Sequence, residues 1–329
     1  MVPQPEQDFQ VGQSLSERFE SGELFVPFEE LTWIDFLGSD RGAVLGNLTT
    51  NHVRQLEPGQ GLETFITEAR GKAFAHGTVY ALPDRLRMVT VPDQFDRLSA
   101  HIDRYVIRED LQIVDASQSH YAVFWPGVAG SQWAQRWQLS PAAAPQLVQQ
   151  TIQIGEVTAE AYQVPWTRSG DWLFVVPKDQ ADALDAALIA EDVLPGSPAI
   201  VHCGRIRHRF PWFGMDCSEA NLPQEMDRDA LAIDFKKGCY LGQETIARLD
   251  AMGQVQKKLT LWEFDSAQVP TPGMELRAGD KVVATVTSGT FCFDHGAPLA
   301  LCTARRSHFS PGATADSPIG SATVINSED

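Results

Sequence analysis

One short pattern occurs twice in the chain, and this repeat limits the folds that the sequence can adopt. Residues 84–98 and 171–184 each run from an aspartate through an apolar, strand-like stretch to a proline, an Asp-Gln pair and an amphipathic stretch. A proline cannot continue a central strand, and an aspartate after it can accept the free amides at the start of a helix. The residues expected in these two roles are Pro92 and Asp93 in the first copy and Pro177 and Asp179 in the second. The repeat therefore predicts two related α+β subdomains that arose by internal duplication, with helices packed on their sheets.

The C-terminal part differs in pattern and predicts a separate unit. After residue 255 the apolar stretches are short and rich in β-branched residues, and turns containing glycine or proline separate them. This spacing is typical of a small β-barrel. A chain of 329 residues also buries enough surface for more than one core, so two or three packed units are expected. The expected units are a polar N-terminal segment (1–27), an α+β region of two intertwined subdomains (28–253) and a C-terminal barrel (254–329).

The net charge of −17 argues against direct binding of nucleic acid, because an acidic surface repels a polyphosphate. The charge is unevenly distributed, since residues 201–260 contain nine Lys and Arg against eight Asp and Glu. This segment could receive an anionic small molecule, or it could simply be a solvated face. No apolar stretch reaches the roughly 20 residues of a membrane helix, and the first residues do not form a secretory signal. Five scattered cysteines do not make a disulfide framework, so a reduced, cytoplasmic protein without membrane contact is expected.

The most specific stretch is Lys-Lys-Gly-Cys-Tyr-Leu-Gly-Gln-Glu-Thr-Ile-Ala-Arg at residues 236–248. Its second half has helical spacing, and Gly238 and Gly242 bracket Cys239, which allows a sharp turn and a close approach to a ligand. Cys239 is therefore expected just before a helix N-terminus and beside two lysines, and both sources of positive charge favour a thiolate. These features indicate a reactive thiol. The alternative is a small buried cysteine that fills a gap in the core.

A block of basic and aromatic residues lies just upstream of this motif. Arg205 and Arg209 are four positions apart and are expected to share a helix face, from which a guanidinium can bind a carboxylate in two places. Asp216 and Glu225 are acceptors that suit an N–H and NH₂ edge of the kind found in pterins. Trp212 could stack on such a ring. Ordinary capping and surface ion pairing are the alternative roles for the two carboxylates.

The remaining cysteines do not indicate a metal site. Two Cys–His pairs near the C-terminus have spacings that match no common structural zinc site. Two further cysteines flank the arginine block but lack the closely spaced run that is typical of ferredoxin-like clusters. No metal is predicted, and the roles of these four cysteines stay open. They are Cys203, Cys217, Cys292 and Cys302.

The sequence Lys-Gly-Cys-Tyr-Leu-Gly-Gln-Glu at residues 237–244 is similar to the signature of the YgfZ family, the folate-binding relatives of the glycine-cleavage T-protein. Weaker likenesses extend the resemblance over about residues 28–325. They comprise residues 37–55, 205–216, 222–225 and 284–288, where Ala284 stands in place of the glycine of a Gly-x-x-Thr-Ser turn.

The resemblance implies a three-domain, T-protein-like ring around a central cavity that holds tetrahydrofolate or a one-carbon derivative. It also implies work with iron–sulfur proteins or their assembly machinery, and through them an indirect effect on tRNA thiomodification. Cys239 would be the reactive thiol, and Lys237 would favour its thiolate or bind the folate carboxylates. The other residues expected at the folate are Arg205, Arg209, Trp212, Asp216, Glu225, Gly238, Tyr240, Gly242, Gln243 and Glu244.

Two departures from the T-protein pattern argue against glycine-cleavage activity. Where T-proteins carry an acidic pair that assists amine transfer, this chain has Ala75 and His76. The strand that supplies a pterin-binding glutamate in T-proteins has no glutamate here, and only Asp171 lies near that position. Loss of a general acid or base costs on the order of 10² to 10⁴ in rate. Whether the chain catalyses any reaction stays open.

Three hypotheses follow from the sequence. The first is a tetrahydrofolate-binding accessory protein for iron–sulfur cluster assembly or repair. The second is a folate-dependent aminomethyl or one-carbon transferase. The third is a noncatalytic scaffold that binds a partner protein and has kept only the fold.

Overall fold

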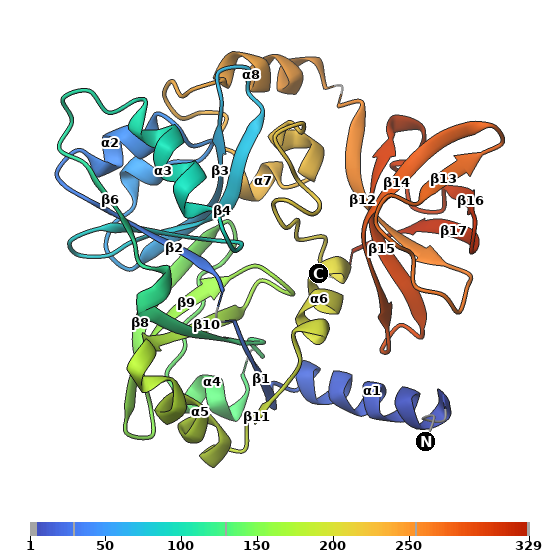
Figure 1. Ribbon diagram of the computed structural model, residues 1–329, viewed down its shortest axis with the longest axis horizontal. Coiled ribbons are helices and arrows are strands. Elements are labelled where there is room, and N and C mark those ends of the chain that lie inside the picture. The colour runs from blue at the N-terminus through green and yellow to red at the C-terminus, as the bar shows by residue number, and fades with distance from the viewer. Residues whose placement is uncertain (1–4, 29, 129, 254, 328–329) are drawn as a thin grey trace.

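The computed structural model describes residues 5–28, 30–128, 130–253 and 255–327. Its strands form an 11-stranded sheet and a closed six-stranded barrel. The sheet lies on the left of Figure 1 and the barrel on the right, with the helix α6 (Pro198–Arg207) between them. The mixed α and β architecture with a C-terminal barrel, expected from the sequence, is confirmed.

The sheet contains the strands of both repeated units. Its strands are β1 (Leu24–Pro27), β2 (Thr32–Leu37), β3 (Gln60–Thr67), β4 (Ala73–Ala81), β5 (Leu86–Thr90), β6 (Gln112–Asp115), β7 (His120–Trp125), β8 (Gln146–Ile154), β9 (Val157–Val164), β10 (Asp171–Pro177) and β11 (Leu194–Pro195). Their order is β11-β1-β7-β10-β9-β8-β3-β4-β5-β2-β6. Outward from the central β8–β3 pair, β3-β4-β5-β2 mirrors β8-β9-β10-β7, so the internal repeat is visible in the topology.

The two copies of the sequence pattern occupy equivalent places in the sheet. Strand β5 leads into α3 (Phe95–Asp103), and β10 leads into α5 (Ala181–Ala190). The helices pack through apolar side chains that are fully buried. Those side chains are Leu98 and Ile102 in α3 and Leu184 and Leu188 in α5.

The expected aspartate caps of these helices are wrong. The residues that precede the helices are Gln94 and Gln180, and neither caps through its side chain. Asp93 adopts a left-handed backbone with φ of 60°, and Asp179 lies inside a short 3₁₀ helix. The hydroxyl of Thr32 on β2 instead accepts the amide of Gln94, at 3.0 Å. A neighbouring strand thus supplies the acceptor that was expected from the local sequence.

The N-terminal segment is more structured than its polar composition suggested. Within residues 1–27 the chain forms α1 (Pro5–Glu20) and then β1, which pairs with both β7 and β11. Phe19 is buried and stacks on Phe124 of β7, with ring centroids 6.1 Å apart. Glu20 receives ion pairs from Arg168 and Arg207. Apolar packing and these two ion pairs join α1 to the sheet and to α6.

The barrel has its own core. Its strands are β12 (Lys257–Phe264), β13 (Glu275–Ala278), β14 (Lys281–Cys292), β15 (Ala297–Arg305), β16 (Thr314–Ser317) and β17 (Gly320–Ile325). They close into the barrel in the order β12-β15-β14-β13-β16-β17. A second apolar cluster joins the outside of the barrel to α6. It consists of Cys203 and Ile206 from α6 with Leu259, Leu261, Cys292, Leu299 and Leu301 from the barrel.

The remaining helices are α2 (Arg41–Gly46), α4 (Gln132–Arg136), α7 (Asp229–Ala232) and α8 (Gln243–Met252). Helix α8 crosses the top of the molecule toward β12 (Figure 1). In the part of the chain that the structure describes, every helix is too short or too polar to span a lipid bilayer.

Candidate functional site

A cavity of about 810 Å³ lies where the sheet meets the loop that follows α6. Aromatic side chains form much of its wall, namely Phe28, Trp166, Phe210, Trp212 and Phe213. Trp212 meets Phe28 and Trp166 edge to face, with ring centroids 6.4 Å apart in both pairs. We call this space the aromatic cavity. It is large enough for a ring-containing cofactor and offers flat apolar surfaces to it.

One wall of the aromatic cavity is backed by a buried polar triad. His76 on β4 lies 2.7 Å through Nε2 from the Glu63 carboxylate on β3, and 3.2 Å through Nδ1 from the carbonyl oxygen of Pro211. Both partners offer acceptor oxygens, so each ring nitrogen of His76 faces an acceptor. Arg228 donates to both carboxylate oxygens of Glu63, at 2.8 Å and 2.5 Å. His76 and Arg228 therefore share one carboxylate behind the cavity wall.

The state of Glu63 follows from these partners. Burial alone would raise its pKa, but the charge and hydrogen bonds of Arg228, together with those of His76, lower the pKa to about 2. The carboxylate is therefore ionised at neutral pH and is a weak base. It can hold His76 and Arg228 in place, but it is poorly suited to remove a proton from a bound ligand.

Arg205 and Asp216 lie behind Trp212 and have no exposed side-chain surface. The guanidinium of Arg205 donates to Asp216 at 2.7 Å and to Ser288 of β14 at 2.8 Å. It also lies 4.3 Å from the centre of the Trp212 ring, and Asp216 accepts the backbone amide of Trp212 at 3.0 Å. These two predicted ligand-binding residues are thus occupied by internal partners, and they position Trp212 from behind the cavity wall.

Arg209 does not share a helix face with Arg205, so this expectation is wrong. Helix α6 ends at Arg207, and Arg209 has a left-handed backbone with φ of 53°. The amides of Arg209 and Phe210 bond back to the carbonyls of Ile206 and Arg205, a common way for a helix to end. The Arg209 side chain instead pairs with Asp227 at 2.6 Å.

Glu225 has the capping role that was the alternative at the sequence level. Its carboxylate accepts the side-chain amide of Asn221 at 3.0 Å and the backbone amide of Leu222 at 3.3 Å. Both contacts lie at the start of the 3₁₀ helix Pro223–Met226. The aromatic cavity therefore contains only Trp212 among the residues predicted from the basic and aromatic block.

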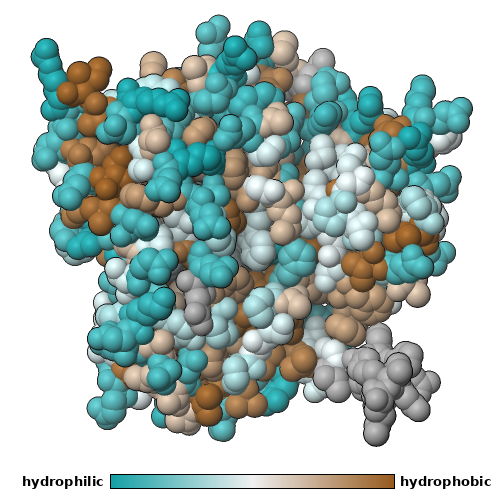
Figure 2. All heavy atoms as spheres, viewed as in Figure 1, coloured by the Kyte–Doolittle hydropathy of each residue, from teal (hydrophilic) through white to brown (hydrophobic). Residues whose placement is uncertain are grey.

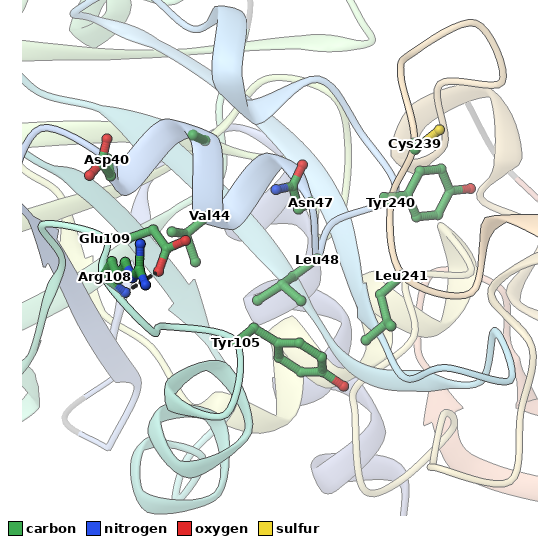
Figure 3. Close-up of a pocket in the computed structure, with 11 residues that line it drawn as sticks. Asp40, Val44, Asn47, Leu48, Tyr105, Arg108, Glu109, Cys239, Tyr240 and Leu241 are labelled. Carbon is green, nitrogen blue, oxygen red and sulfur yellow. Dashed lines mark hydrogen bonds between the residues drawn. The ribbon is translucent and has the colours of Figure 1, made fainter.

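Cys239 lines a second space, of about 730 Å³, next to α2. Val44, Leu48, Tyr105 and Leu241 form its apolar part, and in Figure 3 the side chains of Leu48, Tyr105 and Leu241 point toward one another. Asp40, Arg108 and Glu109 form its opposite, charged end (Figure 3). We call this space the Cys239 groove.

The thiol lies at the rim of the Cys239 groove and is exposed. It is therefore accessible to a reactant, and the alternative of a buried, gap-filling cysteine is wrong. The aromatic cavity and the Cys239 groove share no lining residue. Apolar side chains also gather at the surface over α2 and α3 in Figure 2. Ile107, which follows α3 in the chain, is 84% exposed. The thiol and the aromatic wall thus belong to two separate sites.

Lys237 anchors the motif loop to the rest of the molecule. Its ammonium group is largely buried and donates to the carbonyl oxygens of Gly46, Thr49 and Asn51 at 2.8, 2.5 and 2.9 Å. It also lies 4.9 Å from the centre of the Tyr240 ring. Burial lowers its pKa to about 8. Lys237 therefore links the loop before α8 to the end of α2, and its ammonium group also lies over the ring of Tyr240.

The two glycines of the motif are not equivalent. Gly242 has φ of 78°, and a Cβ atom there would lie 2.5 Å from the carbonyl oxygen of Glu68 and from Cα of Gly71. Gly238 has no such constraint, since a Cβ would meet no heavy atom within 4 Å. The sharp turn therefore lies at Gly242 alone.

The last two motif residues lie in the first turn of α8. Gln243 donates weakly to the carbonyl of Lys237, at 3.5 Å, and Glu244 is exposed. Neither of them lines the aromatic cavity or the Cys239 groove. The structure thus brings the motif residues together as a loop that presents Cys239, at a site other than the aromatic cavity.

The triad of Glu63, His76 and Arg228 was not predicted from the sequence as a unit. A signal existed for Glu63, because it is the one charged residue within the apolar strand stretch 60–67. Its partners come from a neighbouring strand and from a distant loop, so no local spacing could identify them. Among the described residues, no group of three or more His, Cys, Asp or Glu side chains could hold a metal ion.

Comparisons with known proteins agree on one family likeness. The chain is 28% identical over 258 residues to the tRNA-modifying protein YgfZ of Shigella dysenteriae, an alignment that covers 74% of this chain and 73% of the relative. It is 27% identical over 294 residues to a probable aminomethyltransferase of Halobacterium salinarum, which covers 85% of this chain and 79% of the relative. No family model matches the chain.

A solved structure of similar fold agrees with these sequence likenesses. The crystal structure of the glycine cleavage system aminomethyltransferase T from Bartonella henselae superposes with a TM-score of 0.79 at 13% identity. The superposition covers 95% of this chain and 88% of the other. The resemblance to YgfZ proteins and the T-protein-like fold are therefore confirmed.

Proposed function

From its likeness to YgfZ proteins, we propose that this chain is a cytoplasmic, tetrahydrofolate-binding accessory protein for the assembly or repair of iron–sulfur clusters. Its clients would be iron–sulfur proteins or their assembly machinery, and its effect on tRNA thiomodification would be indirect. The observation that carries the proposal is the aromatic cavity, which is lined by Trp166 and Trp212 within a T-protein-like fold.

The aromatic cavity suits the pterin end of a folate. A pterin is planar, so its faces can pack on Phe28, Trp166 and Trp212, while its polar edge needs hydrogen-bond partners. Thr78, Asp93 and Gln94 supply such groups among the lining residues. Because the described lining contains no Lys or Arg, the glutamate tail of the folate is expected to extend toward solvent and to add little affinity.

Calorimetric titration with tetrahydrofolate tests the proposal. Trp212→Ala should weaken binding about 10- to 100-fold, because it removes one aromatic wall of the cavity. Tyr105→Ala is the matched control, since Tyr105 is an aromatic residue of the Cys239 groove, and it should leave the affinity unchanged. The absence of binding by the unmodified chain would eliminate the folate proposal. Loss of binding in Tyr105→Ala alone would place the folate in the Cys239 groove.

We further propose that Cys239 handles sulfur or a one-carbon group as a reactive thiol. The support is its exposure at the rim of a groove and the anchoring of its loop by Lys237. Cells that carry Cys239→Ala should lose activity of iron–sulfur enzymes, whereas cells that carry Cys217→Ala, with a fully buried thiol replaced, should not. Full enzyme activity with Cys239→Ala would exclude the thiol role and leave the folate proposal intact.

A folate-dependent aminomethyltransferase is the second candidate, and the Halobacterium relative with that name favours it. The local chemistry favours it less, because His76 is held by Glu63 and Glu63 is a weak base with a pKa of about 2. We expect the chain to form no methylene-tetrahydrofolate from an aminomethyl donor. Detection of that product would make the aminomethyltransferase the first candidate. The third candidate, a noncatalytic scaffold, predicts that neither folate nor Cys239 affects the phenotype.

A further inference from the structure

Two buried cysteines from distant parts of the sequence face each other between α6 and the barrel. Cys203 on α6 and Cys292 at the end of β14 are 89 positions apart, and their sulfur atoms lie 2.9 Å from each other. A disulfide bond measures about 2.05 Å, so the two sulfurs need to approach by only about 0.9 Å to form one. Neither residue has a role in the function proposed above.

The surrounding contacts hold the two elements in register. Arg205 of α6 donates to Ser288, four residues before Cys292 on β14, at 2.8 Å. Arg207 of α6 pairs with Asp294, two residues after Cys292, at 2.9 Å. The apolar cluster of α6 and the barrel fills the space around the pair. The approach of the two thiols is therefore set by packing and by two polar links, rather than by a mobile loop.

The two thiols are also chemically distinct. Cys203 donates its proton toward Cys292, and this hydrogen bond lowers the pKa of Cys292 while it raises that of Cys203. Both thiols are buried, since Cys292 has no exposed surface and Cys203 is 8% exposed. An oxidant that reaches them must be small, and a peroxide can enter during brief local opening of α6.

We propose that Cys203 and Cys292 are a modification site at which hydrogen peroxide forms a reversible disulfide that joins α6 to the barrel. The sulfur of Cys292 attacks one oxygen of the peroxide, the O–O bond breaks, and the departing hydroxide takes a proton and leaves as water. The sulfur of Cys203 then attacks the resulting sulfenic acid, the S–O bond breaks, and the second oxygen leaves as water with the proton of Cys203. Both sulfurs are oxidised, one peroxide is reduced, and two waters are released.

The disulfide would fix the barrel to the helix that supports the aromatic cavity. Arg205 lies one half-turn beyond Cys203 on α6, and it contacts both Trp212 and Ser288. A covalent link at Cys203 therefore restrains the barrel against the residue that supports the cavity wall. Reduction by a dithiol returns the two free thiols.

Peptide mapping after peroxide treatment tests the proposal. The full chain is exposed to hydrogen peroxide, its remaining thiols are alkylated under denaturing conditions, and its proteolytic peptides are identified by mass spectrometry. We expect one cross-linked pair of peptides, containing Cys203 and Cys292 and lighter by two hydrogen atoms, which dithiothreitol separates. The midpoint of thermal unfolding should rise on the order of 5 °C on oxidation and return on reduction, because the bond closes a long loop.

Variants separate this bond from other oxidation events. A Cys239→Ser background prevents linkage between molecules through the exposed thiol. In that background Cys203→Ser should abolish both the cross-link and the upward shift, whereas Cys302→Ala, which removes a buried thiol elsewhere in the barrel, should retain both. Recovery of alkylated Cys203 and Cys292 after peroxide treatment of the unmodified chain would overturn the proposal. A cross-link between any other pair of cysteines would do the same, and neither result depends on a variant that has to fold.

Discussion

Replacement of Asp216 by alanine should strongly destabilise the junction between α6 and the barrel. Asp216 accepts hydrogen bonds from Arg205 at 2.7 Å, Thr287 at 2.6 Å, Ser288 at 2.5 Å and the backbone amide of Trp212 at 3.0 Å. Neither Asp216 nor Arg205 has exposed side-chain surface, so the change leaves the guanidinium buried without its counter-charge. Removal of one partner from a buried ion pair costs about 3–5 kcal/mol of unfolding free energy.

The double variant makes this prediction specific to the pair. Arg205→Met combined with Asp216→Ala removes both charges, so the combined loss should fall short of the sum of the single losses by about 1–3 kcal/mol. Urea unfolding monitored by tryptophan fluorescence measures all three variants, because Trp212 lies against Arg205. Arg277→Met is the control, since it removes the half-exposed ion pair with Glu275 and should cost less than about 1 kcal/mol. Losses that simply add, or a loss below about 1 kcal/mol for Asp216→Ala, would refute the reasoning.

The remaining predictions concern the triad and the motif loop. The folded-state pKa of Glu63 is about 2, below its ordinary value of 4.5. Ionised Glu63 therefore adds roughly 3 kcal/mol to the free energy of unfolding above pH 5, and this stabilisation is lost as the pH falls toward 2. In Glu63→Gln the unfolding free energy, measured by urea titration, should depend less on pH between 5 and 2. An unchanged pH dependence would contradict the lowered pKa of Glu63. Gly242→Ala should destabilise the chain by more than about 2 kcal/mol, whereas Gly238→Ala should change it by less than about 1 kcal/mol, and equal effects in thermal unfolding would be inconsistent with the geometry. Lys237→Met should cost about 1–3 kcal/mol because it leaves buried carbonyl oxygens unpaired, and exposed Lys236→Met should be neutral; a neutral Lys237→Met would show that the carbonyls find other partners.

The repeated pattern predicted the two related halves of the sheet, and the change of pattern near residue 255 predicted the barrel. Periodicity, proline and the change of pattern near residue 255 are local signals, and the strands, helices and barrel follow them. The predicted caps at Asp93 and Asp179 failed because a capping acceptor can come from another strand, as Thr32 shows. A local rule cannot detect a substitute that the tertiary fold supplies.

The candidate site was only partly predictable for a related reason. The motif predicted a sharp turn, which the structure places at Gly242, but it left open whether Cys239 is exposed or buried. The roles of Arg205, Arg209 and Asp216 depend on where α6 ends and on what the barrel presents to it. All three were candidates for ligand binding, with ion pairing as an alternative for Asp216, and the fold pairs each of them with another residue. The separation of Cys239 from the aromatic cavity is likewise a property of the tertiary structure.

The place of β1 in the sheet has a consequence for biosynthesis. This strand precedes the whole first repeat in the chain, yet its hydrogen-bonding partners, β7 and β11, belong to the second. On the ribosome β1 emerges early and must wait, unpaired, until both partners have been translated. A single cut in the gene cannot yield two complete halves, because any fragment that contains the second repeat alone lacks a strand encoded before the first.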